Sequence, residues 1–128
     1  MNILINIIIA ILQILLGFGF VGFWVIFYFT EYKKPKMEEC AFKHEKSFPL
    51  PDLLWNTPCL FIAGIGILLG QKIGFFFSAL AGSGMIFLGL IDLAYVIQNK
   101  FFTYLGIVII LIMLIGGPIL IIIAWLNL

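Results

Sequence analysis

ILINIIIAILQILLGFGFVGFWVIFYFT, residues 3–30, is a run of 28 residues that contains no charged side chain. Asn6 and Gln13 are its only amide side chains. A helix needs about 20 apolar residues to cross a hydrocarbon core about 30 Å thick, so this run is long enough to span a bilayer. The run lacks the positively charged start and the small-residue cleavage site of a secretory signal, so we expect a retained helix.

Three further apolar runs follow, at about 53–70, 73–97 and 102–127. The chain of 128 residues is 64% hydrophobic and 10% charged, whereas soluble domains carry about 25% charged residues. We therefore expect an all-α fold with a single domain, residues 1–128, that forms an integral membrane bundle of four transmembrane helices. The expected location is the cell membrane, which the chain crosses several times.

Charge is concentrated in the polar loop 31–52, which holds ten of the thirteen formal charges. With four spans, this loop shares one face with the turn at residues 99–100, and both termini share the other face with the turn at 71–72. Six lysines lie on the loop face and one on the termini face. Because short cytoplasmic loops are enriched in basic residues, the loop face is predicted to be cytoplasmic and both termini to lie outside.

The second run contains a proline, Pro58, and its start is open to two interpretations. Asp52 is a plausible N-cap for a helix that Pro58 then kinks. Alternatively the helix begins at Pro58 with Thr57 as its N-cap, because proline suits the first helical position. Residues 51–56 would then lie along the membrane interface, anchored by Trp55.

Small and polar residues recur on one face of each run, which favours close packing between membrane helices. Asn6 and Gln13 share such a face, where we expect hydrogen bonds between helices; a solute path is the alternative. The triplet 116–118, Gly-Gly-Pro, predicts a kink or a hinge in the fourth helix. The residues expected to pack the third helix are Gly74, Ser78, Gly82 and Gly89.

Asp92 is the only ionisable residue inside a predicted span. An acid within a membrane is costly and is by default a functional candidate. The alternative is a structural role in which Asp92 fixes the helix register. Its partners would then be Tyr28, Asn56, Tyr104 or Lys100.

Several polar and aromatic side chains are predicted to end at the level of Asp92, and they would line a pocket on the loop face. Apolar walls with a few converging polar groups are typical of small-ligand sites. The candidate ligand-binding or ion-binding residues are Asp92, Tyr28, Glu31, Trp24, Asp52, Trp55, Asn56 and Tyr104.

The loop segment 37–46 predicts a short interfacial helix, in which Glu39 and Lys43 are spaced for an ion pair. Cys40 and His44 have the same spacing and could reach one metal with Glu39 or Glu45 nearby, but no paired CxxC or HxxxH motif accompanies them, and zinc sites generally need three or four ligands. A solvated amphipathic turn is therefore favoured, and no metal site is predicted. A disulfide between Cys40 and Cys59 is not expected in a cytoplasmic loop.

No nucleophile, base and orienting group occur at a spacing that supports catalysis, so a non-enzymatic protein without cofactors is favoured. Its expected partners are the lipid bilayer and either a second copy or a membrane complex; no nucleic acid is expected. We expect it to bind a small hydrophobic or cationic ligand in a loop-face pocket around Asp92, or to be a subunit of a larger complex. Alternatives are a small dimeric transporter or channel using Asp92 as its proton or cation site, and a membrane-embedded enzyme.

Overall fold

The computed structural model describes residues 3–32, 39–100 and 102–128. The described residues form helices joined by turns, without a strand, which confirms the all-α prediction. The long helices are α1 (Ile3–Phe27), α4 (Thr57–Leu68), α5 (Lys72–Asn99) and α6 (Tyr104–Asn127). Shorter elements are the α-helices α2 (Glu39–Glu45) and α3 (Pro49–Pro51) and two π-helical turns, η1 (Tyr28–Tyr32) and η2 (Asp52–Asn56).

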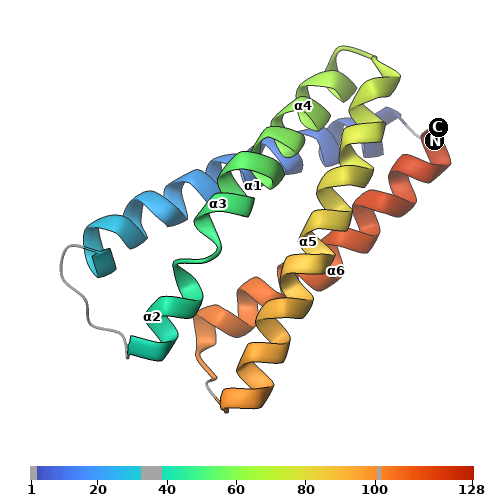
Figure 1. Cartoon of the computed structure of the whole chain (residues 1–128). Coiled ribbons are helices and arrows are strands. Elements are labelled where there is room, and N and C mark those ends of the chain that lie inside the picture. The colour runs from blue at the N-terminus through green and yellow to red at the C-terminus, as the bar shows by residue number, and fades with distance from the viewer. Residues whose placement is uncertain (1–2, 33–38, 101) are drawn as a thin grey trace.

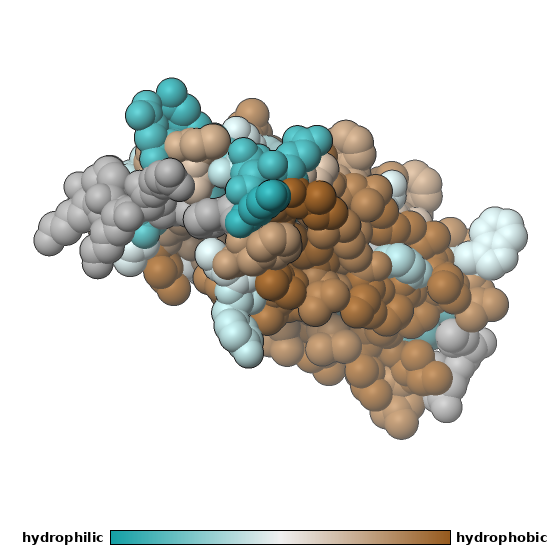
Figure 2. Space-filling model, turned by 90° about the horizontal axis from the view of Figure 1, so that it is seen from below, coloured by the Kyte–Doolittle hydropathy of each residue, from teal (hydrophilic) through white to brown (hydrophobic). Residues whose placement is uncertain are grey.

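Four helical stretches are long and apolar enough to cross a membrane, as in a small membrane protein. They are Ile3–Tyr32, Glu39–Leu68, Lys72–Asn99 and Tyr104–Asn127. The second stretch begins with the charged helix α2, which precedes the apolar part that runs from α3 to α4. On the face seen in Figure 2, hydrophilic residues gather at the end that carries α2, and hydrophobic residues cover most of the rest. The cytoplasmic placement of the loop face stays a prediction.

The helices pack in the order α1, α4, α5, α6, since α4 contacts both α1 and α5, and α5 contacts α6. Figure 1 shows α1 and α6 approaching each other near the termini and separating toward the opposite end, where α2 lies between α1 and α5. Near the termini, the Asn6 side-chain amide donates to Asn127 Oδ1 at 3.2 Å. Deeper in the bundle, the Ser78 hydroxyl donates to Gln13 Oε1 at 3.0 Å, which links α5 to α1. Both amides of α1 therefore bond across helices.

Glycines set the closest approach between α5 and α6. A Cβ atom added to Gly82 would lie 2.5 Å from the carbonyl oxygen of Gly117, and one added to Gly117 would lie 2.6 Å from that of Gly82. Without such side chains the two backbones come together, as is usual where helices associate in lipid. At the predicted break, α6 continues through Pro118 as one helix.

Neither expected helix start near Pro58 is observed. The helical segment begins at Pro49 and passes through η2 into α4, so Asp52 lies inside it and is not its N-cap. Asn56, rather than Thr57, precedes α4. Proline lacks an N–H group, and its ring crowds the carbonyl four residues earlier. The wider π-helical turn before Pro58 relieves this crowding and lets the helix continue.

Candidate functional site

The loop face is organised by α2, which bridges α1 and α5. Phe42 lies on the side of α2 that faces α1. Its ring stacks on Phe27 with centroids 6.1 Å apart and makes a T-shaped contact with Tyr32, with centroids 5.3 Å apart. Ala41 is buried at 2% exposure. The following residues of α2, His44 and Glu45, lie toward the acidic groups of α5 and η2. This helix therefore has one aromatic side and one ionisable side.

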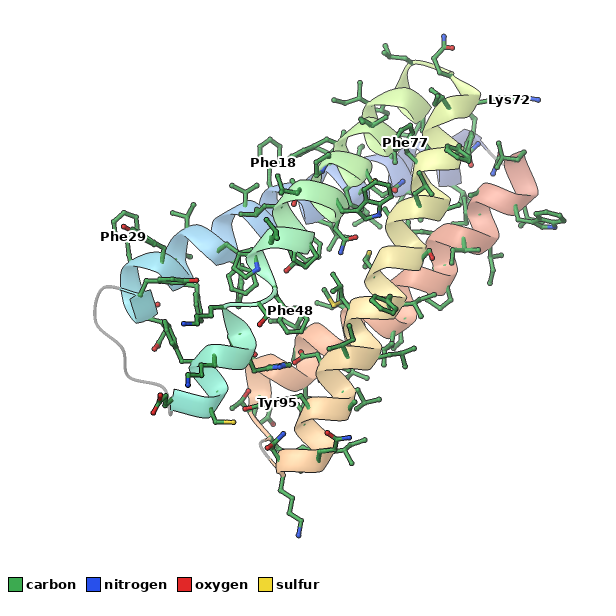
Figure 3. The ribbon with its side chains drawn as sticks, viewed as in Figure 1. Phe18, Phe29, Phe48, Lys72, Phe77 and Tyr95 are labelled. Carbon is green, nitrogen blue, oxygen red and sulfur yellow. The ribbon has the colours of Figure 1, made fainter. Side chains whose placement is uncertain are left out.

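His44 connects α2 to α5. Its Nε2 lies 3.0 Å from Asp92 Oδ1, and the two side chains are 13% and 14% exposed. The imidazole also stacks on Tyr95, with centroids 3.6 Å apart and planes at 5°. Phe48 packs against the same imidazole in a T-shaped arrangement, with ring centroids 4.9 Å apart. Figure 3 shows Tyr95 beside α2 and Phe48 between α3 and α5. These contacts fix the plane of the ring and the direction of Nε2.

A second acidic group, Asp52, is buried at 3% exposure and connects η2 to α1. Its Oδ2 accepts a hydrogen bond from Trp24 Nε1 at 2.8 Å. Its other oxygen, Oδ1, has no hydrogen-bond partner among the described residues. One turn later, Asn56 is fully buried, and neither atom of its amide is hydrogen-bonded within the described part of the chain. Gly84 makes room for it, because a Cβ there would collide with Asn56 Oδ1.

Glu45 is the third carboxylate near Asp52 and Asp92. We call these three residues, together with His44, the loop-face cluster. One ligand atom from each of His44, Glu45 and Asp92 lies within 4.8 Å of the others. Glu45 belongs to α2, outside the apolar part of the span. Burial, followed by the nearby charges of Asp92 and Asp52, raises the pKa of Glu45 to about 7.

No lysine forms an ion pair with the cluster within residues 39–100. Within α2, Lys43 instead forms an ion pair with Glu39: Lys43 Nζ lies 3.2 Å from Glu39 Oε1, and both side chains are largely exposed. The three carboxyl groups therefore lie together at the loop face without a lysine partner among residues 39–100.

A groove of about 700 Å³ lies beside the cluster, between α5 and the segment from α2 to η2. Its walls are mainly apolar, and among the described residues that line it His44 is the only one that is ionisable. Ser47 and Ser83 contribute exposed hydroxyl groups. The full lining is His44, Ser47, Phe48, Pro51, Trp55, Asn56, Leu80, Ser83, Gly84, Phe87, Leu88 and Ile91.

The structure brings several predicted site residues together. Asp52, Trp24 and Asn56 meet at η2, Trp55 lines the groove, and Asp92 belongs to the cluster. The hydrogen-bond partner of Asp92 is His44 rather than the Tyr28, Asn56, Tyr104 or Lys100 considered from the sequence.

Three other predicted residues lie elsewhere. Tyr28 lines a second groove, of about 370 Å³, with Trp24 and residues of α3 and η2. Glu31 lies in η1, at the end of the first span. Tyr104 begins α6 and is 93% exposed. The predicted helix at 37–46 is observed as α2; residues 37–38 lie outside the described residues.

Sequence reasoning missed Tyr95 and Ser83 as site residues, and it grouped His44 and Glu45 with Cys40 rather than with Asp92. Cys40 is exposed, with Sγ 3.9 Å from the Tyr95 hydroxyl, and both it and Cys59 are free thiols. The available signal was the position of His44 and Glu45 on α2, but nothing in the pattern said where α2 docks.

The chain matches no protein-family model, no curated protein and no solved structure. Its function is therefore inferred from the geometry of the loop face.

Proposed function

We propose that this chain is a small membrane protein that binds a long-chain hydrophobic molecule, with an uncharged hydrogen-bonding head group, in the 700 Å³ groove. The composition of the groove carries this proposal. Ligand sites commonly measure about 300–1,000 Å³ and combine apolar walls with a few polar groups. Here Phe87, Leu88 and Ile91 supply apolar wall, while Ser47 and Ser83 supply hydroxyl groups along it.

An uncharged head group fits this lining better than a cation. The carboxylates of the loop-face cluster are absent from the lining, and a charge placed against apolar walls without a partner is costly. Ser83 can donate or accept a hydrogen bond, and Asn56, which lines the same groove, has an amide without a hydrogen-bond partner among the described residues. A ligand that bonds to these groups would remove part of the cost of burying them.

Occupancy can be tested with a photoactivatable long-chain alcohol and the full chain in nanodiscs. Ile91→Trp places a large ring in the groove, whereas Leu90→Trp changes the neighbouring position of α5, which is outside the lining and 52% exposed. We expect Ile91→Trp to lower crosslinking to groove residues about tenfold, equivalent to about 1.4 kcal/mol of binding. Leu90→Trp should leave crosslinking unchanged.

Two results would overturn the proposal. Crosslinks spread evenly over the exposed helix faces would indicate ordinary lipid contact only. An equal response of both tryptophan variants would show that the probe does not occupy the groove. The head-group contact is tested by Ser83→Ala, which should reduce the preference for the alcohol over an alkane probe by about two- to tenfold.

A further inference from the structure

We propose that His44, Glu45 and Asp92 bind a divalent transition-metal ion that links α2 to α5 at the loop face. His44 and Glu45 are adjacent on α2, and Asp92 projects from α5. The site is therefore assembled from two elements 48 residues apart at the His44–Asp92 contact. It is distinct from the hydrophobic part of the groove, which it meets at His44.

The distances fit coordination of one ion. Nitrogen and oxygen ligands lie about 2.1 Å from zinc, so two of them at the tetrahedral angle of such sites are about 3.4 Å apart, about 0.4 Å more than the contact in the metal-free chain. His44 Nε2 and Asp92 Oδ1 are 3.0 Å apart. One carboxylate oxygen of Glu45 lies within 4.8 Å of a ligand atom of His44 and of one of Asp92, so a change of the Glu45 side-chain rotamer would bring all three ligand atoms to a single ion.

Charge supports a cation at this place. Three carboxylates meet at the loop face, and within residues 39–100 none of them forms an ion pair with a lysine. Asp52 lies near enough for its charge to act on Glu45; it is 3% exposed, and its Oδ1 accepts no hydrogen bond among the described residues. A buried, unpartnered carboxylate oxygen is costly, and a neighbouring cation offsets that cost.

Aromatic side chains hold the imidazole of His44 in place. Tyr95 stacks on the imidazole and Phe48 meets it edge-on, so Nε2 is held toward Asp92 before any ion binds. Such outer contacts orient ligands and tune metal affinity. The hydrogen bond between His44 and Asp92 is the metal-free arrangement of the same two ligand atoms.

The donor set selects the class of ion. Imidazole suits zinc and other first-row transition metals, whereas magnesium and calcium prefer oxygen ligands alone. One imidazole and two carboxylates therefore favour Zn²⁺ over Mg²⁺. Three protein ligands also leave a position open for water or a further ligand, as in zinc sites that are not purely structural.

The test is equilibrium dialysis of the full chain in nanodiscs of neutral lipid. The protein is first freed of metal with EDTA and then titrated with Zn²⁺. We expect one ion per chain, and at least about tenfold weaker binding in His44→Gln, Glu45→Gln and Asp92→Asn. The matched control is Glu39→Gln, which removes an exposed carboxylate from the same helix and should leave the affinity unchanged. Mg²⁺ should bind at least about tenfold more weakly than Zn²⁺.

Glu45→Gln keeps the fold testable, because it preserves the His44–Asp92 contact and the size of the side chain. Zn²⁺ should raise the thermal unfolding midpoint of the unmodified chain and not that of Glu45→Gln. The absence of saturable Zn²⁺ binding would overturn the proposal. So would an equal loss of affinity in Glu39→Gln and Glu45→Gln, or equal affinity for Mg²⁺ and Zn²⁺.

Discussion

The two ends of the bundle are held together by different kinds of contact. Near the termini and the middle, neutral amides and hydroxyls bond across helices, and Gly82 and Gly117 bring α5 and α6 into backbone contact. At the loop face, α1 and α6 separate, and the short helix α2 fills the space with aromatic and ionisable side chains (Figure 1).

This difference separates stability from binding. Close backbone contact through small residues leaves no room for a ligand, and it is the main way in which helices associate in lipid. The loop face instead combines carboxylates, an imidazole and a groove of about 700 Å³. Substitutions at the packed end should therefore change folding without changing ligand binding, whereas substitutions in the loop-face cluster or the groove should change binding as well.

The largest effect on stability is expected from Gly82→Ala. The new methyl group would lie 2.5 Å from the Gly117 carbonyl oxygen, so the backbones must move apart. Overpacking of this kind costs about 1–3 kcal/mol. Gly22→Ala is the matched control, because nothing lies within 4 Å of its added Cβ, and it should be neutral or stabilise the helix by up to about 1 kcal/mol. Reversible unfolding in mixed micelles measures both, and equal effects would contradict the packing account.

Trp24→Phe should have an effect of similar size, because it removes the indole N–H that bonds to Asp52 at 2.8 Å. A hydrogen bond to a charged group contributes about 1.5–3 kcal/mol, and its loss leaves both oxygens of Asp52 unpartnered. Trp125→Phe, at a position 80% exposed, should change stability by less than about 0.5 kcal/mol. The same unfolding assay compares them, and similar values for the two variants would show that the Trp24–Asp52 bond contributes little.

Glu45 should make the metal-free protein less stable at high pH. Its folded pKa of about 7 exceeds the ordinary value of 4.5, so the folded state retains a proton that the unfolded state loses between those two values. Stability therefore falls as pH rises from about 4.5 to 7 and stays lower above pH 7. Glu45→Gln should reduce this dependence and raise stability at pH 8 by on the order of 1 kcal/mol. Unfolding in EDTA at pH 5 and pH 8 tests it; an unchanged pH dependence would contradict the assignment.

Ser78→Ala should have the smallest effect. It removes the hydrogen bond to Gln13, and bonds of this type between membrane helices contribute about 0.6 kcal/mol on average. The measurement is again the free energy of unfolding. A loss as large as that of Trp24→Phe would mean that the middle of the bundle depends on polar contacts as strongly as the loop face does.

The sequence predicted the parts of the molecule that follow from local pattern. The run 3–30 and its three successors predict four long helices, because length and hydropathy decide whether a segment suits lipid. The recurrence of Gly74, Ser78 and Gly82 at helical spacing indicates one face of α5, and these residues are buried. Such features need no knowledge of distant contacts.

The loop face could not be predicted in the same way. The segment that becomes α2 is charged and has no hydrophobic stripe that determines where it packs, so the contact of His44 with Asp92, 48 residues away, left no local signal. Both predicted helix starts near Pro58 were wrong, because the standard capping rules do not anticipate a π-helical turn at Asp52–Asn56.

The docking of α2 on α5 is the central claim, and a double-mutant cycle on His44→Gln and Asp92→Asn tests it most directly. Unfolding free energies of the four metal-free proteins, measured in EDTA, give the coupling between the two side chains. We predict a coupling of about 1 kcal/mol, because the side chains share a partly buried hydrogen bond at 3.0 Å. Additive effects within about 0.3 kcal/mol would show that the residues do not interact and would contradict the arrangement of the loop face.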